Sequence, residues 1–119
     1  MALVYRQKLP ATDGLIVEMD AAKCLTARAM YAEFAEAFVF PSSPNEGSLD
    51  VLLDFMRDLA WQKENWVEVQ LKNVEKAKKK NLSNYNELVR LLEMIRDYWE
   101  EASQNPLFDR KVYFSVTGW

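Results

Sequence analysis

Three short stretches of the chain alternate hydrophobic and polar residues, and each of them predicts a β-strand. They are LIVEMD at 15–20, WVEVQLK at 66–72 and KVYFSVT at 111–117. A period of two is typical of a strand that buries one face, and the Ile and Val residues in these stretches also favour strands. The pattern predicts a central strand at 15–20 and a half-exposed edge strand at 66–72.

A helical period of hydrophobic residues follows the first predicted strand. Thr26 is a suitable N-cap, and Met30, Phe34 and Phe38 then recur at intervals of four. This spacing places the three side chains on one side of a helix. The helix is expected to end before Pro41.

A second helix is predicted to start after Ser48, which can act as its cap. At about 100° per residue, its apolar residues fall within one continuous arc, formed by Leu49, Leu52, Leu53, Met56, Leu59 and Ala60. The remaining arc holds Asp50, Asp54, Arg57 and Asp58. The aspartates are four residues apart, so they are neighbours on the polar side of the helix.

A third and longer helix is predicted from Asn84. Asn84 and Glu87 resemble a capping box, and Asn105 and Pro106 end the helix. Its buried stripe is predicted to consist of Leu88, Leu91, Leu92, Ile95, Trp99 and Ala102. The polar run EKAKKKNLSN at 75–84 has no convincing period, so it is interpreted as a connection that can contain a short helical turn, with solvated lysines.

The predicted elements follow the order β-α-α-β-α-β. Strands separated by helices usually lie parallel, with the helices covering the sheet. The sequence therefore predicts an α/β fold, a small three-stranded parallel sheet packed with helices. A chain of 119 residues is the size of one domain, so 1–119 is interpreted as a single domain with its core at about 15–116.

Composition narrows the chemistry that the chain can perform. The sequence contains no histidine, only three glycines and one cysteine, Cys24. It therefore lacks the most common general base, a glycine-rich phosphate loop and a disulfide framework. Catalytic-triad and nucleotide-dependent enzymes are disfavoured, no cofactor is expected, and Cys24 is interpreted as a small buried side chain.

Net charge bears on the partners of the chain, and the distribution of hydrophobic residues bears on its location. A formal net charge of −3 disfavours nucleic acid and anionic membranes as main partners. No segment has the roughly 20 apolar residues of a membrane span, and the residues near the start do not resemble a signal peptide. We expect a cytoplasmic protein that is a monomer when alone.

Three interpretations of Asp50 and Asp54 are open from the residues alone. They could form a Mg²⁺ or carboxylate catalytic site, although no third ligand is evident. They could be a solvated helix face, or a face that a partner binds. The solvated face is the ordinary interpretation. Like charges four residues apart cost roughly 0.2–0.5 kcal/mol, and only Arg57 lies near enough to offset them, which weakens that interpretation. The loop PSSPNEG at 41–47 could extend the same acidic surface.

The motif SLDVLLDFM at 48–56 follows a helix ending EAFVFP and a proline-containing loop, and it resembles the barstar family of intracellular ribonuclease inhibitors. The resemblance runs from about residue 15 to 116. Its most specific part is the spacing of Leu49, Asp50, Leu52 and Asp54. It implies the same three-stranded parallel fold, and an inhibitor that plugs a ribonuclease active site with an acidic helix and the loop before it.

The resemblance also implies a set of partner-binding residues. By position, Asp50 and Asp54 correspond to two inhibitory aspartates, Leu53 to an interface tryptophan and Asp97 to a glutamate on the later helix. The full set is Asn45, Glu46, Gly47, Asp50, Leu53, Asp54 and Asp97. The implied partner is a cognate basic ribonuclease or another toxin-like protein, and the implied role is an immunity protein rather than an enzyme.

Two departures from the family pattern leave other partners open. The loop PSSPNEG has no tyrosine where the family has several, and Leu53 replaces an aromatic anchor of the kind that carries much binding energy. One rival is a regulatory or adaptor domain that binds a protein other than a nuclease. Another is RNA binding through Lys72, Lys76, Lys78, Lys79 and Lys80.

Overall fold

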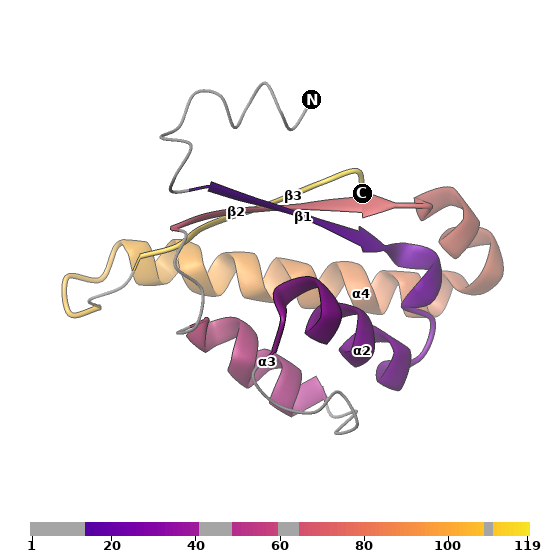
Figure 1. Cartoon of the computed structure of the whole chain (residues 1–119), viewed down its shortest axis with the longest axis horizontal. Coiled ribbons are helices and arrows are strands. Elements are labelled where there is room, and N and C mark those ends of the chain that lie inside the picture. Colours follow the sequence, from indigo (N-terminus) through magenta and orange to yellow (C-terminus); the bar gives the residue numbers. More distant parts are fainter. Residues whose placement is uncertain (1–13, 41–48, 60–64, 109–110) are drawn as a thin grey trace.

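A computed structural model describes residues 14–40, 49–59, 65–108 and 111–119 of the chain (Figure 1). The elements follow the predicted order, with one short 3-10 helix added after the first strand. They are β1 (Gly14–Asp20), η2 (Ala21–Lys23), α2 (Ala27–Phe38), α3 (Leu49–Asp58), β2 (Trp66–Lys72), α4 (Val74–Ser103) and β3 (Tyr113–Thr117).

The three strands form one parallel sheet, as predicted. β1 pairs with β2 along its whole length, and β2 pairs with β3 from its first residue, with Trp66 opposite both Gly14 and Tyr113. Helices α2, α3 and α4 lie on one face of this sheet (Figure 1). The predicted α/β fold class is confirmed.

The predicted positions of two strands within the sheet are wrong. The strand order is β1-β2-β3, so β2 is central and β1 lies at an edge. Side-chain alternation reports which face of a strand is buried, whereas backbone pairing decides whether the strand is central. All three strands pack one face against the helices, so their alternation could not tell centre from edge. Strand β2 was also predicted to be half-exposed, but Glu68, one of its polar residues, is buried.

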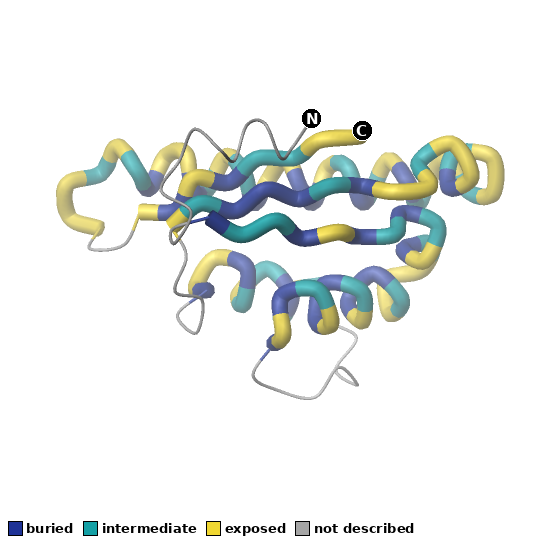
Figure 2. Tube along the Cα trace, turned by 45° about the horizontal axis from the view of Figure 1, so that its top comes forward, coloured by how far each residue is buried: buried dark blue, intermediate teal, exposed yellow. Residues whose placement is uncertain are grey.

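The hydrophobic core fills the space between the helices and the covered face of the sheet. Figure 2 shows buried positions recurring along every helix and strand of that layer. The ring centroids of Phe34 and Phe38 are 6.2 Å apart, and Phe38 lies 6.5 Å from Phe114, so stacked rings join α2 to β3. The stripe predicted for the last helix is confirmed, because all six of its residues are buried.

Helix α2 begins and ends where its sequence predicts. Thr26 is the N-cap, and its Oγ1 accepts a hydrogen bond from the amide of Ala29 at 3.0 Å. The side chains of Met30, Phe34 and Phe38 are buried. The core-facing side of this helix therefore follows directly from the four-residue spacing.

Helix α4 begins earlier than predicted. The predicted polar connection at 75–84 is mostly helical, since α4 starts at Val74. Asn81 interrupts the helix with φ −160° and ψ 86°, and its Oδ1 accepts a hydrogen bond from the amide of Asn84 at 3.2 Å. Asn81 is therefore the cap of the longer part of α4.

The predicted capping box at Asn84 and Glu87 is wrong. The side-chain amide of Asn84 donates to the carbonyl of Leu25 instead, which ties α4 to the segment before α2. Glu87 binds Arg90 one turn further along the helix. Asn84 is therefore engaged in a tertiary contact, and Asn81, three residues earlier, caps the helix in its place.

Replacing Asn81 by alanine is expected to lower the free energy of unfolding by about 1 kcal/mol, because the substitution removes the acceptor for the Asn84 amide. Asn81→Asp keeps an acceptor at this position and should retain most of the stability. Urea denaturation of the two variants measures the difference. An equal loss in both variants would show that the cap contributes nothing.

Candidate functional site

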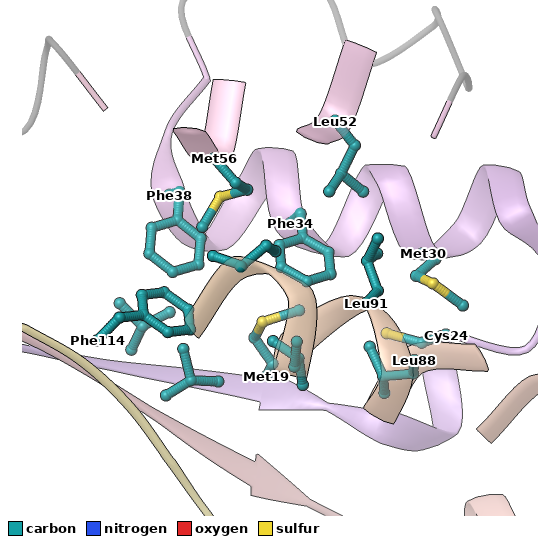
Figure 3. Packing of buried hydrophobic residues seen from close by; sticks show 14 of the residues in the cluster. Met19, Cys24, Met30, Phe34, Phe38, Leu52, Met56, Leu88, Leu91 and Phe114 are labelled. Atoms are coloured by element: carbon teal, nitrogen blue, oxygen red, sulfur yellow. The ribbon is translucent and has the colours of Figure 1, made fainter. Parts of the chain in front are cut away.

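Helix α3 exposes its acidic side because its opposite side is packed into the core. Leu52 and Met56 are fully buried, and Figure 3 shows both side chains directed from α3 toward the core. Asp50 and Asp54 are exposed. The predicted division of this helix into an apolar and a polar side is confirmed at these four positions.

Contacts at both sides hold α3 in place. The indole Nε1 of Trp99 on α4 donates a buried hydrogen bond to the carbonyl oxygen of Met56 at 2.8 Å. The ring of Phe55 lies 4.8 Å from that of Phe40, just after α2. The acidic side of α3 is therefore carried by a helix that is anchored to both of its neighbours.

The aspartates of α3 form no ion pair with a cation among the described residues. Arg57 is the nearest candidate in sequence, but its guanidinium lies over the ring of Tyr98 on α4, 5.7 Å from the centroid. The three ion pairs among the described residues all lie within α4. The negative charges of these aspartates repel one another in the free protein. A basic partner would replace that repulsion by attraction, which favours binding.

Asp97 lies on a different element from the other candidate residues. It is exposed on α4 and pairs with Arg96, whose Nη2 is 3.2 Å from its Oδ1. The next residue, Tyr98, is covered by Arg57 of α3. This turn of α4 therefore borders the C-terminal half of α3, and the role of Asp97 stays a prediction.

The loop part of the candidate site cannot be placed. Asn45, Glu46 and Gly47 lie outside the residues that the structure describes, as does the predicted cap Ser48. Their contribution to partner binding stays a prediction.

A surface hollow of about 210 Å³ lies between α2, α3 and α4, and we name it the Leu53 hollow. Its lining residues are Met30, Leu49, Asp50, Leu53, Glu87, Arg90, Leu91 and Met94. Two of the predicted partner-binding residues, Asp50 and Leu53, are thus brought to one concave surface. Leu53 is half-buried there rather than protruding.

The α4 side of this hollow was not predicted from the sequence. Glu87, Arg90 and Met94 recur at intervals of three and four, which places them on one line beside the buried stripe. That signal could have identified the line. It could not have shown that the line faces α3, because the relative placement of two helices is a tertiary property.

Four of the five lysines considered for RNA binding lie at the start of α4, and the fifth, Lys72, is the last residue of β2. Lys72, Lys76, Lys79 and Lys80 are exposed, whereas Lys78 pairs with Glu75 and lies 5.5 Å from the ring centroid of Tyr85. The contacts of α3 are made nearer the other end of α4, at Tyr98 and Trp99. RNA binding by these lysines stays a prediction.

Cys24 is expected to resist alkylation in the folded protein. Its side chain is fully buried, and the thiol donates to the carbonyl oxygen of Asp20 at 3.5 Å. Burial, followed by the negative charges of Glu33 and Asp20, raises the pKa of the thiol from its ordinary 9.0 to about 12. Since the thiolate is the reactive form, iodoacetamide near pH 8 should modify the urea-unfolded protein far faster than the native one.

The same shift sets a dependence of stability on pH. The pKa of Cys24 is higher in the folded than in the unfolded state, so its contribution to stability is complete below pH 9.0 and declines as the pH rises toward about 12. Rapid alkylation of the native protein near pH 8 would contradict this description of Cys24.

The described part of the chain offers neither a metal site nor a membrane-spanning helix. Within it, no group of three or more Cys, Asp or Glu side chains is arranged to hold a metal ion. None of the described helices combines the length and the hydropathy needed to cross a membrane.

The chain matches the model of a known protein family. The family model described as Barstar (barnase inhibitor) matches residues 15–110 of the chain. The match begins in β1, extends beyond α4, and contains every candidate partner-binding residue. No curated protein matches the chain.

Proposed function

The chain belongs to the barstar family, and we propose that it is an immunity-type inhibitor that binds the active site of a basic ribonuclease. The family is one of inhibitors, and the proposed role requires no catalytic residue. A chain without histidine suits that role.

The observation that carries this proposal is that two carboxylates on α3 form no ion pair with any residue the structure describes. Asp50 and Asp54 are exposed on an anchored helix, and Arg57, the nearest cation in sequence, is engaged over Tyr98. Ribonuclease active sites gather Lys and Arg to hold RNA phosphates, so two fixed carboxylates can occupy the phosphate positions. Charge-assisted hydrogen bonds would hold the complex, and long-range attraction would speed its formation.

The other candidate residues would complete the interface around this pair. Leu53 lies between the two aspartates in sequence and supplies an apolar contact. Asp97 would add a carboxylate from α4, and the loop at 45–47 would contact the rim of the nuclease site. We further propose that 1–119 acts as one domain, monomeric before binding, in the cytoplasm, and forms a one-to-one complex.

A cleavage assay on a fluorogenic RNA tests the proposal. The chain is titrated against a panel of small basic microbial ribonucleases, including any encoded by a neighbouring reading frame. Inhibition of at least one member, complete at one equivalent and weaker at high salt, is the expected result.

Two other outcomes would replace the proposal. Inhibition of no member would favour an adaptor that keeps the fold and binds another protein. Salt-sensitive binding of the RNA itself, lost when Lys76, Lys79 and Lys80 are neutralised, would favour RNA binding.

A further inference from the structure

Strand β3 leaves one row of backbone groups free, because it forms an edge of the sheet. The amide of Tyr113 donates to the carbonyl of Asn65, 2.8 Å away, so the backbone groups of Tyr113 point toward β2. Backbone groups alternate between the two sides of a strand, so those of Phe114 and Val116 point away from β2. They form no hydrogen bond with another described residue. An edge of this kind can pair with a further strand.

The opposite edge of the sheet is partly covered by its own chain. Glu33 of α2 accepts a hydrogen bond from the amide of Asp20, the last residue of β1, at 2.8 Å. A side chain from the same molecule therefore already engages this edge. The edge of β3 is the better place for an added strand.

We propose that a second copy of the chain pairs with this edge, β3 against β3 in antiparallel orientation, around a two-fold axis at Ser115. Phe114 of one copy then lies opposite Val116 of the other. Each of the two Phe114–Val116 pairs exchanges two hydrogen bonds through the outward backbone groups. The two three-stranded sheets become one continuous sheet. This inference does not depend on the proposed function.

Side chains on both faces of the sheet suit this register. The side chain of Phe114 is buried in the core. Tyr113, Ser115 and Thr117 therefore lie on the face opposite the helices, because successive side chains of a strand alternate. Tyr113, which is 55% exposed, lies opposite Thr117 of the second copy. This pair and the Phe114–Val116 pair both join an aromatic to a β-branched residue, a combination that stabilises antiparallel strands.

The two-fold axis brings the two Ser115 hydroxyls together. The Ser115 Oγ is buried and has no hydrogen-bond partner within the part of the chain that the structure describes, which is unfavourable for a polar group. Opposite residues of a non-hydrogen-bonded antiparallel pair have their Cα atoms about 4.5 Å apart, so one hydroxyl can donate to the other. A register shifted by two residues would lose this contact and place Phe114 or Val116 opposite its own counterpart.

The helix beside β3 is complementary to itself as well. Arg96 and Glu100 lie one turn apart on α4, and both line a hollow of about 240 Å³ that α4 forms with β3. Glu100 takes part in none of the ion pairs of the described residues. A two-fold axis reverses the direction of α4 in the second copy, so Arg96 of one copy can meet Glu100 of the other. A two-fold interface requires such self-complementary charges.

The dimer should dissociate on dilution. One five-residue strand and one turn of a helix make a small contact beside the roughly 1,600 Å² of a standard stable interface. The monomer proposed above is the dilute form of the chain. Tyr98, which contacts α3, lies about 200° around α4 from Arg96 and from Glu100, so the acidic side of α3 stays accessible in the dimer.

Disulfide trapping tests the register. Ser115→Cys places two thiols opposite each other, with Cα atoms about 4.5 Å apart, a separation that a disulfide spans. Oxidised glutathione should convert the concentrated variant to a covalent dimer on a non-reducing gel. Thr117→Cys is the matched control on the same strand and face, because its two thiols would be offset by roughly 13 Å along the strands. It should stay monomeric, as should the wild type, whose Cys24 is fully buried.

Sedimentation equilibrium tests the contact itself. The wild type should form a dimer reversibly as its concentration rises to roughly 1 mM. Val116→Pro removes an outward amide and leaves the pairing with β2 intact, and Ser115→Lys places like charges opposite each other. Each should weaken the dimer roughly tenfold or more. Glu18→Gln makes the same charge change as Ser115→Lys on the exposed surface of β1 and should leave the dimer unchanged.

Circular dichroism confirms that each variant is folded, and Ser115→Lys keeps the test valid if Val116→Pro fails to fold. A wild type that stays monomeric throughout would overturn the inference, and so would a dimer that Ser115→Lys leaves unchanged. Trapping of Thr117→Cys in place of Ser115→Cys would overturn the register. None of these results depends on whether a ribonuclease is inhibited.

Discussion

Asp54→Ala is expected to weaken binding of the target ribonuclease by roughly a hundredfold or more while the protein remains folded. Removing one member of an ion pair that is buried in a complex leaves the other charge without compensation, which costs about 3 kcal/mol or more. Asp54 is exposed in the free protein and has no ion pair among the described residues. Removing its carboxylate should therefore lower the affinity for the ribonuclease and hardly change the free energy of unfolding.

The matched control for this variant is Glu93→Ala. Glu93 is exposed on α4 and lines neither the Leu53 hollow nor the acidic side of α3, yet its replacement changes the net charge by the same amount. Dissociation constants from surface plasmon resonance and thermal denaturation curves should be measured for both variants. A large loss of stability in Asp54→Ala would mean that Asp54 does not lie on the exposed face of α3. Equal losses of binding in Asp54→Ala and Glu93→Ala would mean that the effect comes from the net charge alone.

Trp99→Ala is expected to cause the largest loss of stability, about 3–5 kcal/mol. The indole is buried, and its Nε1 donates to the Met56 carbonyl at 2.8 Å. The substitution leaves a cavity between α3 and α4 and a buried carbonyl without its donor. Because this hydrogen bond helps to hold α3, the variant should also bind the nuclease more weakly.

Trp99→Phe separates the contribution of the hydrogen bond from that of the buried ring, and Leu107→Ala serves as a surface control. Trp99→Phe keeps most of the ring and removes the donor, so it should lose about 1–3 kcal/mol. Leu107→Ala truncates a side chain that is 87% exposed and should change the stability by less than about 0.5 kcal/mol. Urea denaturation gives all three values, and a Trp99→Phe variant as stable as the wild type would show that the hydrogen bond does not anchor α3.

The elements that could be predicted are those in which a local pattern has one consistent explanation. The four-residue spacing of Met30, Phe34 and Phe38 and the cap at Thr26 predict α2 correctly, because both signals depend only on nearby residues. The order of the strands in the sheet could not be predicted in this way. All three strands bury one face against helices, so their side-chain patterns carry no information about their neighbours in the sheet.

The same limit applies to the candidate site. The exposure of Asp50 and Asp54 follows from the helical period of α3, since Leu52 and Met56 occupy the opposite side. The engagement of Arg57 by Tyr98 could not be predicted, because it joins two helices that are separated by a strand. That contact nevertheless matters for the acidic face, because it engages Arg57, the cation nearest to the aspartates in sequence.

The Leu53 hollow likewise depends on contacts between elements. Its residues come from three helices, and no local pattern relates Met30 of α2 to Met94 of α4. The family resemblance pointed to Leu53 as a contact residue but described a tryptophan there. The structure adds that the leucine lies in a concave surface, which changes the kind of contact that a partner could make.

The central claim is that the acidic side of α3 binds a basic ribonuclease, and isothermal titration calorimetry tests it most directly. The wild-type chain and Asp54→Ala should each be titrated into every member of the nuclease panel under identical conditions. The predicted result is tight one-to-one binding of the wild type to at least one nuclease and a loss of roughly a hundredfold or more in the variant. Binding of equal strength by both proteins, or binding of the wild type to no nuclease, would contradict the claim.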